Sequence, residues 1–282
     1  MICLNFAKKL ILFTLSFLFL LFQPSFIPTV KAAPEAVAVP ELSSDEPVTS
    51  ASILSTSTQL NQTKFPDKGI PVLMYHSIST DPQNSLCVSE KDFNAQMEWL
   101  SSQNFHALTV DQLYNALATG ASVPEKPILI TFDDGYKDNY TAAWPILQKY
   151  GFVGTFFIIT NAIVPSRIDW DQLKDLVKHG NSIGSHTVNH LDLRTMKDSQ
   201  QESELANSKK ILEEHLGVKV NSFCYPSGKY NQTTINLLQK LDYKIAFTTD
   251  TGRVHSGDDP LKLTRLRISG GMSLSSFKSL LQ

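Results

Sequence analysis

From Ile70 onward, short apolar runs alternate with longer amphipathic stretches, and this alternation restricts the fold more than any other feature. The apolar runs span residues 70–75, 106–110, 127–132, 154–159, 182–185, 222–225, 245–248 and 263–268. The stretches between them have a helical period, and residues typical of helix ends, such as Asp169 and Gly217, bound several of them. Continuous apolar strands that alternate with helices are typical of a parallel sheet covered by helices. Such a sheet can close into a barrel or stay open, and in both cases functional residues are expected at the carboxyl ends of the strands.

The first 32 residues have the pattern of a secretory signal peptide. Lys8 and Lys9 precede a 13-residue apolar run over residues 10–22, which is too short to span a bilayer comfortably. Val30 and Ala32 then stand at the −3 and −1 positions of an A-x-A-like cleavage site. The alternative is an uncleaved N-terminal anchor. We therefore expect a secreted or cell-surface protein, attached to a membrane only if this segment stays uncleaved.

Residues 33–67 are rich in Ser, Thr and Pro and have no sustained period. This composition predicts a flexible linker; a disordered N-terminus without a function of its own is an equally good interpretation. A single domain is then expected over residues 68–282, because neither a repeat nor a second compositional block follows.

Charge and composition exclude several classes of protein. Hydrophobic residues make up 42% of the chain, which is enough for a core and excludes a disordered chain. The formal net charge is −2, and without residues 1–32 the remaining 22 basic and 27 acidic residues give −5. No basic excess marks a nucleic-acid surface, so we expect no nucleic-acid partner. The sequence does not indicate an oligomeric state.

Cysteines are too few for a disulfide framework. After the predicted signal peptide only Cys87 and Cys224 remain. They could form one disulfide, but the sequence does not decide whether the two side chains meet.

Polar clusters stand where predicted strands end. Asp133 and Asp134 follow the strand over residues 127–132, and His186 and His190 follow the strand over residues 182–185. Asp-Asp-Gly alone is more often a turn with a helix cap, and a pair of histidines alone is only suggestive. One carboxylate and two imidazoles together make a three-ligand site with open positions, as a catalytic zinc site requires. The second aspartate is then free to act as a base, which predicts metal-assisted hydrolysis of an acyl group.

These motifs resemble those of the polysaccharide deacetylases of carbohydrate esterase family four, also called the nodulation-B homology domain. Thr131-Phe-Asp-Asp-Gly135 resembles the first motif of that family, and Ser185-His-Thr-Val-Asn-His190 resembles the second. The resemblance covers about residues 68–282. For the fold we expect an α/β domain, a distorted (β/α) barrel with about seven parallel strands.

The resemblance implies a role for each matching residue. Asp134, His186 and His190 would bind a divalent metal, most simply Zn²⁺, although Co²⁺, Ni²⁺ or Mn²⁺ could fill the same site. Asp133 would be the general base that takes a proton from the attacking water. Near the third motif, which here reads Tyr225-Pro-Ser-Gly228, the backbone N–H of Ser227 would help to hold the oxyanion, with Tyr225 and Pro226 beside the substrate.

The chain departs from the family pattern at two positions. The third motif lacks its usual Arg, which leaves open how Asp133 is oriented; Arg265 or Arg267, near the end of the last strand, could substitute. No Leu-x-His motif closes the chain. His76, which ends the first strand, instead resembles the general acid of the circularly permuted branch, which includes poly-N-acetylglucosamine deacetylases. His255 is the alternative acid.

Trp170 could wall the acetyl pocket, but as an aromatic residue at a helix start it is about as consistent with core packing. The expected activity is removal of N-acetyl groups from a cell-wall or extracellular polysaccharide that contains N-acetylglucosamine. The alternatives are an O-acetyl esterase that acts on xylan-type polymers, and a secreted glycan-binding protein that has lost its chemistry.

Overall fold

The computed structural model describes residues 62–164 and 166–282. The predicted signal peptide and most of the predicted linker lie outside these residues. Gln62–Thr63 (β1), within the stretch predicted as a linker, pairs antiparallel with Val123–Pro124 (β4). None of the helices in the described part of the chain has the length and hydropathy of a membrane span.

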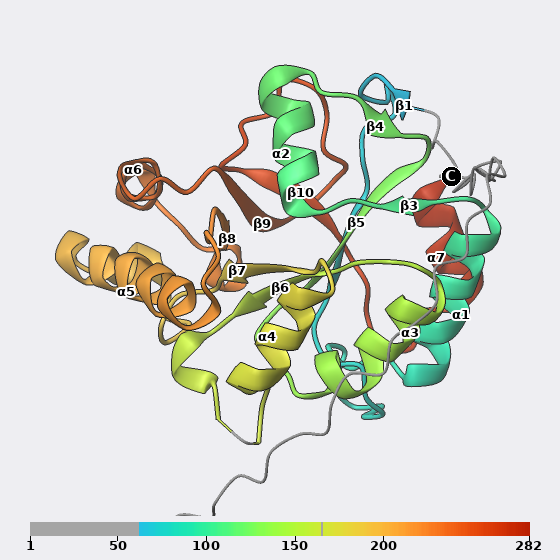
Figure 1. Ribbon diagram of the computed structural model, residues 1–282, viewed down its shortest axis with the longest axis horizontal. Helices are drawn as coiled ribbons and strands as arrows, with labels where there is room; N and C mark the ends of the chain where they lie inside the picture. Colours follow the sequence, from blue (N-terminus) through green and yellow to red (C-terminus); the bar gives the residue numbers. More distant parts are fainter. Residues whose placement is uncertain (1–61, 165) are drawn as a thin grey trace, which may run out of the picture. The chain divides into compact units, whose positions relative to one another are not determined.

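Seven parallel strands close into a barrel (Figure 1). They are β2 (Val72–Tyr75), β5 (Pro127–Phe132), β6 (Thr155–Ile158), β7 (Ser182–Ser185), β8 (Ser222–Cys224), β9 (Ile245–Thr251) and β10 (Leu263–Arg267). Their spatial order is β2-β10-β9-β8-β7-β6-β5, and pairing between β2 and β5, from Val72 opposite Leu129 to Tyr75 opposite Phe132, closes the ring. The expected α/β barrel with about seven strands is therefore confirmed.

One predicted strand lies outside the barrel. Residues 106–110 were expected as a strand, and only His106–Ala107 (β3) pairs, with Pro127 and Ile128 at the amino end of β5. The reason is local, because Thr109 already caps the next helix: its side chain accepts from the Gln112 backbone N–H at 3.2 Å and completes a capping box.

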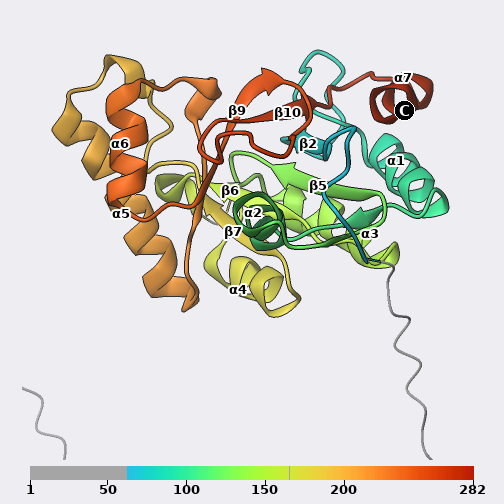
Figure 2. The ribbon, with the colours of Figure 1, turned by 90° about the horizontal axis from the view of Figure 1, so that it is seen from above.

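Helices surround the barrel. They are α1 (Glu90–Ser102), α2 (Val110–Thr119), α3 (Trp144–Lys149), α4 (Trp170–Lys178), α5 (Asp198–Leu216), α6 (Gln232–Lys240) and α7 (Leu274–Leu281). Both views place α5 and α6 on one side of the barrel and α1, α3 and α7 on the opposite side (Figures 1 and 2). Asp169 caps α4, and Gly217 ends α5 in the left-handed conformation, as the sequence indicates.

The alternation of side chains along β5 separates two apolar cores. Ile128, Ile130 and Phe132 belong to the core between barrel and helices, whereas Leu129 belongs to the cluster that fills the barrel. Thr131 is buried near the carboxyl end, where it meets polar side chains. The interior of the barrel is therefore apolar along most of its length and polar at the carboxyl end of the strands, where the predicted site residues lie.

Candidate active site

A cavity of about 210 Å³ opens at the carboxyl ends of the barrel strands. Its lining residues are His76, Leu86, Asp133, Asp134, His186, His190, Ser227, Thr249 and Arg267. They come from the segments that follow or end β2, β5, β7, β8, β9 and β10, together with one loop residue, Leu86. The structure therefore brings most of the predicted site residues into one pocket.

Asp134, His186 and His190 meet around a single carboxylate oxygen. Asp134 Oδ1 lies 3.4 Å from His186 Nε2 and 3.6 Å from His190 Nε2. This oxygen is buried and has no hydrogen-bond partner. His186 Nδ1 lies 2.7 Å from the carbonyl oxygen of Cys224, which can only accept, so this nitrogen donates, and in the neutral imidazole Nε2 keeps its lone pair. With neutral imidazoles, a carboxylate oxygen and two nitrogen lone pairs face one another across these distances, an arrangement that a cation would bridge.

These distances fit a divalent metal. A tetrahedral ion with bonds of about 2.1 Å holds its ligands about 3.4 Å apart, close to both observed separations. Asp133, His186 and Cys224 form a second group of potential ligands. In that group both carboxylate oxygens of Asp133 already accept hydrogen bonds from a guanidinium, whereas Asp134 Oδ1 is free of donors. The Asp134 group is therefore the better metal site.

Several residues of this site have a positive φ angle, which sets the direction of their side chains. Asp134 has a φ of 73°, Thr187 of 67°, His190 of 57° and Ser227 of 51°. Non-glycine residues rarely adopt this conformation, and such outliers persist where the surrounding structure enforces them. Residues 186–190 form a turn and not a helix, and this turn places His190 beside His186 with ring centroids 4.7 Å apart.

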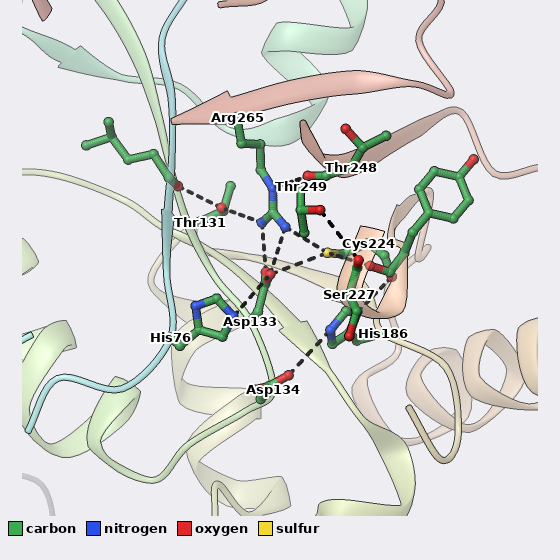
Figure 3. A network of polar contacts seen from close by, with 12 residues as sticks. His76, Thr131, Asp133, Asp134, His186, Cys224, Ser227, Thr248, Thr249 and Arg265 are labelled. Atoms are coloured by element: carbon green, nitrogen blue, oxygen red, sulfur yellow. Dashed lines mark hydrogen bonds and ion pairs between the residues drawn. The ribbon is translucent and has the colours of Figure 1, made fainter. Parts of the chain in front are cut away.

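Arg265 holds Asp133 from inside the barrel (Figure 3). Its Nη1 donates to Asp133 Oδ1 at 2.8 Å and its Nη2 to Oδ2 at 2.7 Å. The remaining donors reach the Thr248 carbonyl at 2.9 Å, Thr131 Oγ1 at 3.0 Å and Cys224 Sγ at 3.1 Å. All five N–H groups of the guanidinium are paired. Of the two candidates for the missing third-motif arginine, the structure places Arg265 on the aspartate.

This pairing keeps Asp133 ionised. Burial by itself would raise the pKa of Asp133, but the charge of Arg265 and its hydrogen bonds outweigh burial and hold that pKa well below its usual range. Burial also raises the pKa of the Cys224 thiol, so the neutral S–H is available to donate to Asp133 Oδ2, 3.5 Å away.

His76 lies on the other side of Asp133. Its Nε2 is 3.9 Å from Asp133 Oδ2, and its side chain is 12% exposed. Burial lowers the pKa of His76, and the two neighbouring carboxylates only partly counteract it. His255, the alternative acid, lies elsewhere: it follows Val254, which bridges to Ile70 just before the amino end of β2, and it is exposed.

The segment after β8 places Ser227 at the pocket. Gly228 N–H donates to the Tyr225 carbonyl at 2.8 Å, and Thr249 Oγ1 donates to the Ser227 carbonyl at 3.5 Å. Ser227 is exposed at the pocket, whereas Pro226 is buried beneath it. Tyr225 is fully buried, and its hydroxyl donates to the Leu261 carbonyl at 2.8 Å, so it supports the turn and does not line the pocket.

Of two further residues predicted for the site, the structure places one in the pocket and the other outside it. Arg267 lines the pocket with an exposed side chain. Trp170 does not line it: this residue begins α4 and stacks on His215 of α5, with ring centroids 4.0 Å apart and planes at 9°. The structure thus places Trp170 between two helices, which is the packing alternative that the sequence left open. Cys87 and Cys224 are both free thiols, so the disulfide left open by the sequence is absent.

Some residues of the site were not singled out from the sequence. Thr249 and Leu86 line the pocket, and Glu204 of α5 binds the turn that carries the two histidines. Thr249 had a usable signal, since it lies near the carboxyl end of a strand. Glu204 had none, because a polar residue on a long amphipathic helix is usually solvent-exposed.

Comparisons with known proteins agree with these motifs. A family model described as polysaccharide deacetylase matches residues 120–246. The chain is 40% identical over 217 residues to YxkH of Bacillus subtilis, a protein grouped with the polysaccharide deacetylases, and the match covers 77% of each protein. A poly-beta-1,6-N-acetyl-D-glucosamine N-deacetylase of Staphylococcus aureus is 25% identical over 211 residues, 70% of this chain and 72% of that protein.

A solved structure of the Streptococcus pyogenes deacetylase PplD in complex with acetate superposes with a TM-score of 0.72 and 31% identity. The match covers 79% of this chain and 100% of PplD. The chain therefore belongs to the polysaccharide deacetylase family, the carbohydrate esterase group with the nodulation-B homology domain.

Proposed function

We propose that this protein is a secreted, metal-dependent hydrolase that removes N-acetyl groups from a polysaccharide containing N-acetylglucosamine. Deacetylase activity follows from the family; the metal, the amide bond and the location are the proposal. The observation that carries it is the difference between two adjacent aspartates: Asp134 Oδ1 faces two imidazole nitrogens without a hydrogen bond, whereas both oxygens of Asp133 accept from Arg265.

Asp134, His186 and His190 would hold the metal. Two nitrogens and one carboxylate suit Zn²⁺, and Co²⁺, Ni²⁺ or Mn²⁺ accept the same ligands. The chemistry that such a cation supplies when bound is polarisation of the acetyl carbonyl and a lower pKa for the attacking water.

Asp133 would act as the general base. Arg265 donates to one lone pair on each of its carboxylate oxygens and the Cys224 thiol donates to Oδ2, and the remaining lone pair can accept a proton from water. The bidentate pair fixes the carboxylate plane, so the base needs no reorientation when the water approaches. As the C–O bond forms, negative charge moves to the acetyl oxygen, and the turn at Ser227 would supply a backbone N–H toward it.

His76, in its protonated imidazolium form, would then donate a proton to the sugar nitrogen as the C–N bond breaks, which gives acetate and a free amine. An amine leaves poorly without this proton, so the acid matters more for an amide than for an ester. Proximity of His76 to Asp133, together with the poly-N-acetylglucosamine N-deacetylases among the relatives, supports the amide assignment. The predicted signal peptide over residues 1–32 supports an extracellular glycan as substrate.

Acetate release by the chain from residue 33 onward tests this function. The substrates are N-acetylglucosamine oligomers linked β-1,6 or β-1,4, peptidoglycan, and acetylated xylan as an ester, each with and without a chelator. We expect chelator-sensitive release from an amide glycan, and a loss of about 10²–10⁴-fold in kcat in His76→Ala with that substrate. Equal losses on amide and ester would contradict the role of His76. Binding of glycan without any acetate release, at every metal concentration, would contradict the hydrolase.

A further inference from the structure

The turn that carries the metal-ligand histidines is held by a helix outside the pocket. Glu204 of α5 accepts from the backbone N–H groups of Val188 and Asn189, with its Oε2 at 2.9 and 2.8 Å. Its Oε1 accepts from Asn189 Nδ2 at 2.6 Å. The side chain is buried, with 7% of the residue exposed. A buried carboxylate that accepts several N–H groups from one turn makes strong hydrogen bonds there.

The other backbone groups of the turn are paired as well. Thr187 N–H donates to Ser185 Oγ at 3.3 Å, and His190 N–H donates to Thr187 Oγ1 at 2.9 Å. Ser185 Oγ in turn lies 2.6 Å from Ser208 Oγ, one helical turn beyond Glu204 on α5. Each N–H from residue 187 to 190 therefore has a partner, and α5 supplies or supports three of them.

A second segment fixes the turn from the opposite edge. Thr160 N–H donates to the Thr187 carbonyl at 3.2 Å, and Asn161 N–H donates to the Val188 carbonyl at 3.0 Å. Asn161 Nδ2 also donates to Asn189 Oδ1 at 2.9 Å. Asn189 thus joins this segment to Glu204, and the amide cannot rotate without losing one of its two bonds.

We propose that Glu204, acting through Asn189, is a positioning residue that sets the affinity of the metal site. This inference rests on the proposed metal site. His186 directly follows β7 and is buried, so the barrel already places it. His190 is half-buried, has a left-handed backbone and depends on the turn for its position relative to Asp134. Loss of Glu204 would leave His190 free to move away from Asp134 Oδ1.

Glu204→Gln is the test variant, because it keeps size and one carbonyl oxygen. Its amide N–H₂ can serve neither the two backbone donors nor Asn189 Nδ2, so at least one bond is lost. We expect the Kd for Zn²⁺ or Co²⁺, measured by calorimetric titration of the chelator-treated full chain, to rise about 10–100-fold. Turnover at saturating metal should recover toward the wild-type value.

Glu213→Gln is the matched control. Glu213 lies on the same helix, accepts from the Val220 backbone N–H at 3.0 Å and pairs with Lys209 at 3.1 Å, away from the turn. This variant should lose thermal stability and keep the wild-type Kd for metal. A purely structural role for Glu204 would give the same pattern as Glu213, and that outcome would overturn the proposal.

A double variant that exchanges the carboxylate and the amide between positions 204 and 189 distinguishes positioning of the metal ligands from a general loss of the fold. In Glu204→Gln with Asn189→Asp, the glutamine amide can donate to the new carboxylate while its carbonyl accepts from the backbone. We expect the double variant to recover at least tenfold of the lost metal affinity. No recovery, or a wild-type Kd in Glu204→Gln, would overturn the proposal while the metal site itself stands.

If the wild-type chain binds none of Zn²⁺, Co²⁺, Ni²⁺ and Mn²⁺, the proposed function fails and this inference fails with it. If Glu204→Gln does not fold, Asn189→Ala takes its place. It removes one bond to Glu204 and the bond to Asn161, and it should raise the Kd severalfold; an unchanged Kd would count against the proposal.

Discussion

Asp133 and Asp134 are adjacent in the chain and adjacent in the pocket, but the protein treats them in opposite ways. Asp133 is buried, and both of its oxygens accept from one guanidinium. Asp134 has a left-handed backbone and a buried oxygen that accepts no hydrogen bond and faces two imidazole nitrogens. One carboxylate has a permanent cationic partner within the fold, and the other has ligands arranged for a cation from outside.

This difference explains how two like charges are tolerated side by side. Two carboxylates that share a site normally force one of them to stay protonated. Here Arg265 neutralises the first from inside the barrel, and a metal would neutralise the second from the pocket. The two aspartates therefore differ in the source of their cation, which is Arg265 for Asp133 and a bound metal for Asp134. Each cation can be removed separately.

The largest effects are expected from substitution of the two aspartates, which should differ in whether metal binding is lost together with turnover. Asp133→Asn should lower kcat by about 10²–10⁴-fold, the usual contribution of a general base, while the Kd for Zn²⁺ stays near the wild-type value. Asp134→Ala should abolish metal binding and turnover together. Calorimetric titration and acetate release on the same preparations check both. Loss of metal binding in Asp133→Asn would contradict the assignment of Asp133 as the base and Asp134 as the metal ligand.

Removal of Arg265 tests the internal cation. Arg265→Met leaves Asp133 buried without its partner, which should cost about 3–5 kcal/mol of unfolding free energy. Urea unfolding of metal-free protein measures it. Arg267→Met, which removes an exposed arginine two residues along the same strand, should change stability by less than about 0.5 kcal/mol. The double variant Asp133→Asn with Arg265→Met should be more stable than Arg265→Met alone, and the reverse order would contradict the account.

Removal of the metal tests the external cation. At a free metal concentration a hundredfold above Kd, binding should contribute about 2.7 kcal/mol, which a chelator removes. For a domain of this size that corresponds to a fall in Tm of about 5–11 °C. Asp133→Asn should retain the chelator-induced shift, and Asp134→Ala should lose it. A shift that survives in Asp134→Ala would place the metal elsewhere.

The smallest effect concerns the thiol beside Arg265. Cys224→Ala leaves one guanidinium N–H without its acceptor in the barrel interior, which should cost about 1–3 kcal/mol. Cys224→Ser keeps an acceptor and should cost less. Cys87→Ala, at the other free thiol, is the control. Thermal unfolding of the three variants checks the order, and equal stabilities of Cys224→Ala and Cys87→Ala would show that the thiol contributes nothing to the network.

Much of this arrangement could be predicted from the sequence because the barrel brings strand ends together. Residues that directly follow an apolar strand, such as Asp133, His186 and His76, converge in any closed parallel sheet. Local pattern also defined the caps at Asp169 and Gly217.

Contacts between elements distant in sequence could not be predicted in the same way. Arg265 and Arg267 lie on the same face of β10, so the choice between them depends on depth along the strand: Arg265 is buried in the barrel, whereas Arg267 ends the strand and is exposed. The environment of Trp170 stayed open because an aromatic residue at a helix start can turn toward the pocket or toward a neighbouring helix, and His215, on which it stacks, lies 45 residues away in the chain. Glu204 has no local signal, since its partners lie on a turn from another part of the fold.

The location of a bound ion tests the central claim most directly. Crystals of the wild-type protein grown with Zn²⁺ or Co²⁺, measured at the absorption edge of the metal, would show the ion by its anomalous scattering. The account predicts one peak about 2.0–2.2 Å from Asp134, His186 Nε2 and His190 Nε2, with the Arg265–Asp133 pair intact. A peak between Asp133, His186 and Cys224 with Arg265 displaced, or none at saturating metal, would contradict it.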